Sequence, residues 1–305
     1  MEALVTKSTG SWYELRNDRG ETFRGRIRGK LRLEGLKTTN PIAVGDRVIC
    51  EEESHGLFVI SAVKPRRNYI IRKSNNLSKQ KQIIAANLDQ LLVVVTMVTP
   101  RTSTGFIDRV LVTAEAYHVP VVIAFNKIDI YEEEAIEVLK EYERIYESIG
   151  YDCIQISALR GTNLSELREK LENKTTLFSG HSGVGKSSLL NALAPDIDQK
   201  TAEISSYSEK GKHTTTFAEM FHIGDNTRII DTPGLKDFGV VDLEEQEISH
   251  YFPEMKPLIG NCRFNNCLHV EEPACAVKQA LEDGRISPYR YYSYLSILGN
   301  EDVHH

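Results

Sequence analysis

Apolar and polar positions alternate over very short distances in the N-terminal part of the chain. Turn sequences such as Asp18-Arg19-Gly20, Asn40-Pro41 and Gly45-Asp46 interrupt this alternation repeatedly. Many short strands within so few residues are typical of a small β-barrel. We therefore predict a barrel domain over residues 1–66.

From residue 88 onward, apolar runs alternate with segments of helical periodicity. Leu91–Val98 and Val119–Phe125 are apolar runs of the kind that form strands buried on both faces of a parallel sheet. Further strands are predicted at 153–157, 175–179 and 228–230, and helices at 105–117, 131–149, 164–171 and 186–194. Alternating strands and helices predict a doubly wound α/β domain, which we place at residues 67–240.

Past residue 243 the pattern becomes helical again, and a cluster of cysteine and histidine residues breaks it. Helices are predicted over 276–283 and 288–298. The second helix carries Tyr289, Arg290, Tyr291, Tyr292 and Tyr294, side chains suited to stacking on RNA or a protein partner, or to packing in a core. We predict a third, mainly helical domain over 241–305.

Length and composition restrict the class of protein. A chain of 305 residues accommodates about two domains, or three small ones. Its 41% apolar and 26% charged residues are ordinary globular composition. No apolar run reaches the roughly 18 residues of a membrane span, and the N-terminus is too polar for a signal peptide. We therefore expect a cytoplasmic protein without a membrane segment, whose five cysteines are reduced or bound to metal.

A phosphate-binding loop is the clearest chemical signature. Gly180–Ser187 fits the pattern G-x-x-x-x-G-K-[ST], follows a predicted strand and opens a predicted helix. In such a loop, backbone N–H groups surround phosphate oxygens, Lys186 reaches the β- and γ-phosphates, and the Ser187 hydroxyl binds Mg²⁺. The predicted nucleotide contacts here are Gly180, His181, Ser182, Gly183, Val184, Gly185, Lys186, Ser187 and Ser188.

A second short motif, Asp231-Thr232-Pro233-Gly234, follows the strand that ends at Ile230. A carboxylate at Asp231 suits a water-mediated contact to Mg²⁺, and the Gly234 N–H can sense a γ-phosphate. Alone, such a turn is an ordinary loop. It gains weight because it lies downstream of the phosphate-binding loop with a strand in front of it.

Two further motifs suit the recognition of guanine. Asn126-Lys127-Ile128-Asp129 and Ser157-Ala158-Leu159 each follow a predicted strand. A carboxylate at Asp129 can accept hydrogen bonds from guanine N1–H and the N2 amine, which adenine cannot offer. The Ala158 region can present a backbone N–H to guanine O6. The predicted guanine contacts are Asn126, Lys127, Asp129, Ser157 and Ala158, and they favour GTP and GDP over ATP.

The C-terminal cluster consists of Cys262, Cys267, His269 and Cys275. Three thiolates and one imidazole within 14 residues can form a closed tetrahedral Zn²⁺ site, which would be structural because no position stays open. Reduced thiols without metal are the alternative. The other two cysteines, Cys50 and Cys153, lie in predicted strands and are interpreted as core residues.

Basic residues alternate near the N-terminus, where Arg24, Arg26, Arg28, Lys30 and Arg32 occupy every second position. In a strand this spacing puts all five on one face, which suggests an anionic partner. A solvated face is the alternative, and Gly29 can host a bulge that breaks the alternation. A five-stranded barrel with a cationic face looks like an OB-fold, a frequent RNA binder, and the basic segment 64–81 would extend its footprint.

The order of the nucleotide motifs is unusual. The guanine motifs precede the phosphate-binding loop, and His213-Thr214-Thr215-Thr216 and Asp231–Gly234 follow it. The last two resemble switch I and switch II of P-loop GTPases. This order resembles that of circularly permuted GTPases, whose sheet survives permutation because domain termini usually lie close together.

The barrel, the permuted core and the Cys-x4-Cys-x-His-x5-Cys cluster together resemble the RsgA family, also called YjeQ or YloQ. Supporting strings are Arg28-Gly29-Lys30-Leu31-Arg32, Val44-Gly45-Asp46, Gly211-Lys212-His213-Thr214-Thr215 and Asp231–Leu235. The resemblance implies a GTPase acting on the 30S ribosomal subunit and its 16S rRNA late in assembly. It implies hydrolysis stimulated by the subunit and coupled to release. A monomer with no DNA or membrane partner is expected. The alternative is a zinc-containing GTP switch acting on another RNA or translation component.

Hydrolysis needs a group that orients water. Ras-like GTPases use a Gln after the switch II glycine, whereas Leu235 stands there in this chain. We therefore predict slow intrinsic turnover, with His213 as the activating group. A solvent-exposed loop histidine, or activation by a ribosomal group, is the alternative. Thr215 is our candidate for a second Mg²⁺ ligand, with Thr214 as the runner-up, and Lys186 completes the catalytic set.

Overall fold

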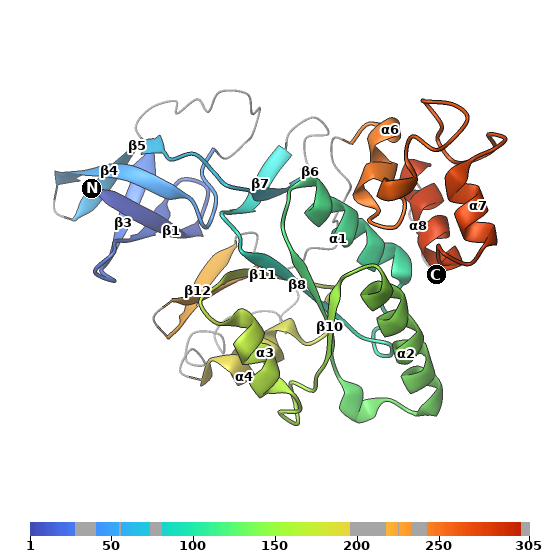
Figure 1. The fold of residues 1–305 in the computed structure, drawn as a ribbon. Coiled ribbons are helices and arrows are strands. Elements are labelled where there is room, and N and C mark those ends of the chain that lie inside the picture. The colour runs from blue at the N-terminus through green and yellow to red at the C-terminus, as the bar shows by residue number, and fades with distance from the viewer. Residues whose placement is uncertain are drawn as a thin grey trace.

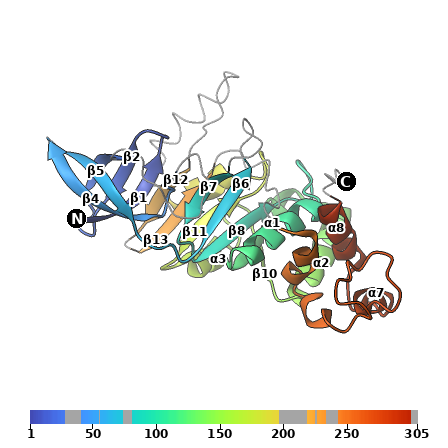
Figure 2. The same cartoon turned by 90° about the horizontal axis from the view of Figure 1, so that it is seen from above.

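The computed structural model describes residues 1–27, 41–54, 56–73, 81–195, 218–224, 226–232 and 243–299. These residues form three regions: a barrel at one end, an α/β sheet domain in the middle and a helical region at the other end (Figures 1 and 2). The three predicted classes of domain are therefore confirmed. No helix in these ranges is long and apolar enough to span a bilayer.

The barrel contains β1 (Glu2–Ser8), β2 (Tyr13–Arg16), β3 (Thr22–Ile27), β4 (Arg47–Ser54) and β5 (Leu57–Val63). They pair in the order β1-β2-β3-β5-β4, and β4 pairs again with β1, which closes the barrel. Val5, Leu15, Cys50 and Ile60 fill its core. Arg24 and Arg26 lie on one exposed face as predicted, while Arg28, Lys30 and Arg32 lie outside the described residues.

The central domain contains β8 (Gln90–Val95), β9 (Val121–Phe125), β10 (Asp152–Gln155), β11 (Thr175–Ser179), β12 (Glu219–Ile223) and β13 (Thr227–Asp231). Their order is β10-β9-β8-β11-β13-β12, parallel throughout except for β12, which runs antiparallel to β13. Helices α1 (Thr104–Ala116) and α2 (Glu133–Ser148) pack on one face, and α3 (Leu164–Leu171) and α4 (Lys186–Leu193) on the other. This is the predicted doubly wound domain.

Strand β12 joins the central sheet to the barrel, because Lys7 of β1 pairs with Glu219. The sheet therefore runs without interruption from β10 into the barrel, and β12 lies between the two (Figure 1). The sequence pattern did not predict β12. It also did not predict the hairpin of β6 (Tyr69–Lys73) and β7 (Lys81–Ala86), which lies where we expected a basic linker.

Two arginines just before that hairpin form ion pairs within the protein. The Arg66 guanidinium forms a buried ion pair with Asp46, with 2.6 Å between Nη2 and Oδ2. Arg67 pairs with Asp89 near the start of β8, at 2.7 Å. Arg66 therefore fastens the segment before the hairpin to the barrel region, and Arg67 fastens it to the central domain. Both contacts reduce the number of cations left for a partner.

The C-terminal region contains α6 (Glu245–Ile248), α7 (Ala276–Glu282) and α8 (Pro288–Leu298), with 3₁₀ turns η3 (Ser249–Tyr251) and η4 (Lys256–Leu258). A further 3₁₀ turn in the central domain, η1, covers Ile128–Ile130. The small C-terminal core is built on Phe252, Met255 and Val277, and α8 packs along α1. Of the tyrosine-rich helix, Tyr291 and Tyr294 are buried, whereas Tyr289 and Tyr292 are exposed.

A buried ionic cluster fixes this docking. Arg290 of α8 is 1% exposed, and its Nη1 lies 2.6 Å from Asp108 Oδ1 on α1. Its Nε lies 2.7 Å from Glu254 Oε1, and its guanidinium stacks 4.6 Å from the Phe252 ring centroid. Tyr146 of α2 donates a hydrogen bond to the same Asp108 carboxylate. The Arg290 side chain is therefore structural.

Candidate nucleotide site and metal cluster

The phosphate-binding loop lies between β11 and α4 and depends on glycine at two places. Gly180 has φ +142° and Gly185 has φ +98°, which side chains rarely adopt. A Cβ on Gly180 would lie 2.3 Å from the Val94 carbonyl oxygen, and one on Gly185 would lie 2.4 Å from Asn126 Nδ2. The loop is thus pressed against the ends of β8 and β9. Such a close backbone turn opening a helix fits a phosphate group.

Lys186 lies inside this loop. Its Nζ donates to the carbonyl oxygens of Gly180, at 2.6 Å, and His181, at 2.9 Å. Burial lowers the pKa of Lys186, and the Asp231 carboxylate partly offsets that effect. Ser182, Ser187 and Ser188 are exposed around the loop, whereas Val184 is buried. A partly buried ammonium surrounded by turned backbone fits the predicted role of Lys186 toward phosphate.

Asp231 ends β13 next to this lysine. Burial raises the pKa of its carboxyl, and the Lys186 ammonium lowers it again in part. Among the described residues, Asp231 Oδ1 is buried and has no hydrogen-bond partner. A buried carboxylate with a free oxygen beside a phosphate loop fits the water shell of Mg²⁺. Gly234 lies outside the described residues, as do His213, Thr214 and Thr215.

The guanine motif is tied directly to the phosphate loop. The buried Asn126 donates through Nδ2 to the Val184 carbonyl at 2.8 Å and accepts from the Ala158 N–H at 3.0 Å. Lys127, at φ +67°, donates to the Gly183 and Thr99 carbonyls at 2.6 and 2.7 Å. The structure therefore brings the loops after β9, β10 and β11 together at one edge of the sheet.

Asp129 is exposed at that edge, and its Oδ1 accepts a hydrogen bond from the buried Ser157 hydroxyl. Ser157 Oγ also accepts from the Arg160 N–H at 3.0 Å, which holds the second guanine motif in a turn. The carboxylate is thus aimed by a neighbouring hydroxyl but keeps solvent access. This is the arrangement that a base with two N–H donors requires.

Two residues of this site carry no motif in the sequence. The buried Tyr131 hydroxyl donates to the Asn126 carbonyl and accepts from the Met97 N–H at 2.9 Å, and burial raises the pKa of Tyr131 to about 12. Phe106 at the start of α1 stacks on His181, with ring centroids 3.7 Å apart. Both side chains read as ordinary core aromatics, so only the fold reveals that they contact nucleotide motifs.

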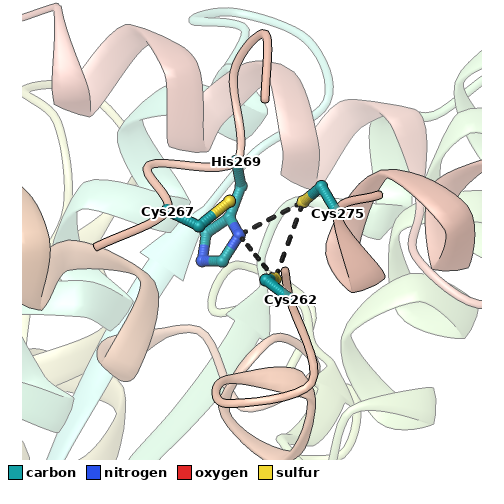
Figure 3. A group of neighbouring side chains, drawn as sticks. All are labelled: Cys262, Cys267, His269 and Cys275. Atoms are coloured by element: carbon teal, nitrogen blue, oxygen red, sulfur yellow. Dashed lines mark hydrogen bonds between the residues drawn. The ribbon is translucent and has the colours of Figure 1, made fainter. Parts of the chain in front are cut away.

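The predicted zinc ligands converge. The ligand atoms of Cys262, Cys267, His269 and Cys275 all lie within 4.8 Å of one another (Figure 3). The Cys262 and Cys275 sulfurs are 3.9 Å apart, and His269 Nδ1 lies 3.6 and 3.3 Å from them. Ligands about 2.3 Å from a tetrahedral ion are separated by about 3.8 Å, so the donor set fits one Zn²⁺.

The second layer of this cluster also fits a metal. Tyr291 donates to the His269 carbonyl at 2.7 Å, and Tyr294 donates to the Leu268 carbonyl at 2.6 Å. Burial raises the pKa of Cys267 to about 12 and also raises that of Cys275. Thiolates disfavoured by burial need a nearby cation, and a bound Zn²⁺ supplies it. The cluster is compatible with one zinc ion.

Known proteins of one family match this chain along nearly its whole length. The RsgA N-terminal domain model matches residues 2–60, and the RsgA GTPase model matches residues 63–241. A protein of Bacteroides fragilis (strain YCH46), named small ribosomal subunit biogenesis GTPase RsgA, is 53% identical over 99% of this chain and 97% of its own length. A protein of the same name from Christiangramia forsetii is 51% identical over 99% of this chain and 97% of its own length.

Two solved structures are similar over nearly their whole length. YjeQ from Thermotoga maritima has a TM-score of 0.78 and 34% identity, covering 98% of this chain and 97% of that one. YloQ, described as a circularly permuted GTPase, has a TM-score of 0.73 and 32% identity, covering 98% of this chain and 94% of that one. With its guanine motifs ahead of its phosphate loop, a closed barrel and a Cys₃His cluster, this chain belongs to the RsgA family of circularly permuted GTPases.

Proposed function

We propose that this chain hydrolyses GTP to GDP and phosphate as an assembly factor in the late maturation of the 30S ribosomal subunit. The subunit stimulates hydrolysis, and hydrolysis is coupled to release. The names of the relatives support the ribosomal part of this proposal. We also infer that the protein acts in the cytoplasm as a monomer, contacts 16S rRNA and binds no DNA.

One observation carries the nucleotide part of the proposal. Asn126 and Lys127 of the guanine motif form hydrogen bonds to the carbonyls of Val184 and Gly183 in the phosphate loop. A base held at Asp129 and phosphates held at the loop can therefore belong to one ligand. Since Asp129 offers a carboxylate where the base would lie, that ligand is a guanine nucleotide.

Each site residue then has a proposed role. Gly180–Gly185 and the start of α4 surround the phosphates, Lys186 neutralises charge that develops during transfer, and Ser187 with Asp231 holds the magnesium ion and its water. When bound, Mg²⁺ would stabilise the negative charge on the phosphate oxygens. His213 and Thr215, which lie outside the described residues, are proposed to orient the attacking water and to bind magnesium.

We propose one structural zinc ion per chain, held by Cys262, Cys267, His269 and Cys275. All four tetrahedral positions are then filled by protein, so no position is open for substrate. The division of the chain into an OB-fold domain at 1–66, a permuted GTPase domain at 67–240 and a zinc domain at 241–305 is part of the same proposal.

The test compares GTP turnover alone, with isolated 30S subunits and with tRNA. We expect slow turnover alone, strong stimulation by subunits and none by tRNA. Stimulation by tRNA instead would favour a different RNA partner. An Asp129→Asn variant is expected to lose guanine affinity and gain affinity for xanthine nucleotides, whose 2-oxo group needs a donor. The matched control is Asp18→Asn, an exposed barrel position, which should bind GTP normally.

A further inference from the structure

A pocket of about 660 Å³ lies over the barrel strands, and none of the described nucleotide-motif residues lines it. Its walls include Lys7, Trp12, Glu14 and Arg24. Trp12, the only tryptophan of the chain, is 45% exposed beside the exposed Arg24. An open aromatic face next to cations is the arrangement on which bases of single-stranded nucleic acid stack.

The charged residues of this pocket belong to a row that crosses the sheet. Register pairs place Arg24 opposite Glu14, Glu14 opposite Lys7, Lys7 opposite Glu219 and Glu219 opposite Asp231. Directly opposite residues point to the same face of a sheet. The row, which we call the charge ladder, therefore links the barrel pocket to the carboxylate at the nucleotide site over four steps, about 19 Å.

Within the ladder, Lys7 forms an ion pair with Glu219. Its Nζ lies 2.8 Å from Glu219 Oε2, with side-chain exposures of 36% and 27%. Glu219 stands opposite Asp231, and two carboxylates in directly opposite positions repel each other. Lys7 thus offsets part of the repulsion that Glu219 exerts on Asp231, although burial and, to a smaller extent, Glu219 still raise the pKa of Asp231. Because the pair is partly exposed, an anion in the pocket can compete for Lys7.

We propose that this pocket binds a nucleotide unit of single-stranded RNA, with a base on Trp12 and phosphate near Arg24 and Lys7, and that the charge ladder couples its occupation to the magnesium site. This inference rests on the proposed function, because it takes RNA as the partner. Glu14, the one acid in the pocket wall, can accept a hydrogen bond from a ribose 2′-hydroxyl or a base amine.

The sign of the coupling follows from the charges. A phosphate that draws Lys7 away leaves Glu219 unpaired opposite Asp231. A divalent cation at Asp231 then relieves the repulsion between the two carboxylates, so RNA in the pocket strengthens the binding of the magnesium nucleotide. By linkage, the magnesium nucleotide strengthens RNA binding by the same factor. The barrel therefore favours RNA most when GTP and Mg²⁺ are bound.

The probe is a hexauridylate RNA added to the full-length protein, with Trp12 fluorescence as the signal. We expect quenching on binding, and dissociation constants raised about fivefold or more in Arg24→Gln and Lys7→Gln. Arg26→Gln is the matched control, because Arg26 lies on the same strand face outside the pocket and pairs with Glu53. Equal weakening by Arg26→Gln, or no quenching, overturns the pocket. Melting curves verify that the variants fold.

The coupling has its own measurement. Adding Mg²⁺ with a non-hydrolysable GTP analogue should tighten hexauridylate binding at least about fivefold, within the usual range of allosteric coupling. In Glu219→Gln, RNA should still quench Trp12, but the magnesium nucleotide should no longer change its affinity. Coupling that persists in Glu219→Gln overturns the role of the ladder.

Pelleting with 30S subunits separates this inference from the proposed function. If subunits bind and stimulate Lys7→Gln as they do the unaltered protein, the pocket proposal fails and the ribosomal function stands. If subunits do not stimulate the unaltered protein, the ribosomal function fails, while the hexauridylate measurements still decide the pocket. Subunit binding that needs Trp12 without quenching by RNA assigns the pocket to a protein instead.

Discussion

The central domain meets its two neighbours through joints of opposite character. At β12, the barrel contacts the central sheet through one register pair and the partly exposed Lys7–Glu219 ion pair, in addition to the Arg67–Asp89 pair described above. The helical region is joined through Arg290, whose guanidinium is buried between Asp108 and Glu254. Exposed pairs contribute little and break easily, whereas removing one partner of a buried pair leaves an uncompensated charge. The first joint can respond to a ligand, and the second holds its parts in place.

The largest effect should come from removing zinc, because the core of the helical region is small. Chelation, or Cys267→Ala, should abolish the cooperative unfolding of that region, a loss on the order of 5 kcal/mol or more. Calorimetry with metal analysis tests this, with about one zinc per chain expected in the unaltered protein. An unchanged melting profile in metal-free protein would refute the structural role. Cys50→Ala, in the barrel core, should leave the metal content unchanged.

Breaking the buried joint should be the next largest effect. Arg290→Met leaves Asp108 and Glu254 without their cation, which costs about 3–5 kcal/mol. The free energy of unfolding from denaturant titration measures it. Arg285→Met, an exposed arginine paired with Asp283, is the control and should change stability by less than about 0.5 kcal/mol. Equal effects of the two substitutions would contradict the contrast between the joints.

Lowering the pH should reduce the free energy of unfolding through His222 on β12, the strand between the central sheet and the barrel. Burial, with the charges of Arg16 and Arg228, lowers the pKa of His222 on β12 from 6.5 to about 4. As the pH falls, His222 therefore takes up a proton in the unfolded chain before it does so in the folded protein, which favours unfolding. The stability contributed by the neutral imidazole is fully present above pH 6.5 and is lost as the pH falls toward 4. The loss should be about 1–2 kcal/mol, reduced from the full shift by partial exposure. In His222→Gln, the free energy of unfolding should depend less on pH between 6.5 and 4 than it does in the unaltered protein.

The smallest effect belongs to the exposed pair itself. A double-mutant cycle on Lys7→Gln and Glu219→Gln should give a coupling energy below about 1 kcal/mol that shrinks with added salt. Denaturant titration of the four proteins supplies it. A salt-independent coupling of several kcal/mol would mean that the contact between β1 and β12 is as strong as the buried Arg290 contact.

Local patterns predicted much of this molecule. Helix α3 and strand β11 have the bounds expected from the sequence, and the phosphate loop and the guanine motifs meet at one edge of the sheet. Each of these elements is predicted by a pattern of a few adjacent residues: hydrophobic periodicity, a glycine-rich motif or a motif at the end of a strand. The four residues of the Cys₃His cluster could be singled out for the same reason, since they lie within one short segment, and the structure brings them together.

What the sequence did not reveal depends on contacts between distant residues. Strand β12 is short and only partly apolar, and it is a strand because β1 and β13 both pair with it. Tyr131 and Phe106 look like core aromatics until the fold sets them against Asn126 and His181. Arg290 was open to interpretation as an RNA contact, and burial decided otherwise.

The pairing of β1 with β12 also dictates when the molecule can be completed during synthesis. The barrel strands lie within the first 63 residues, so the barrel can close as soon as they leave the translating ribosome. Its link to Glu219 spans 212 residues, and the edge of β11 stays uncovered until β13 follows. Because of the circular permutation, the guanine motifs are made first and the motif that begins at Asp231 is the last of the nucleotide motifs to be added, after the barrel has already folded.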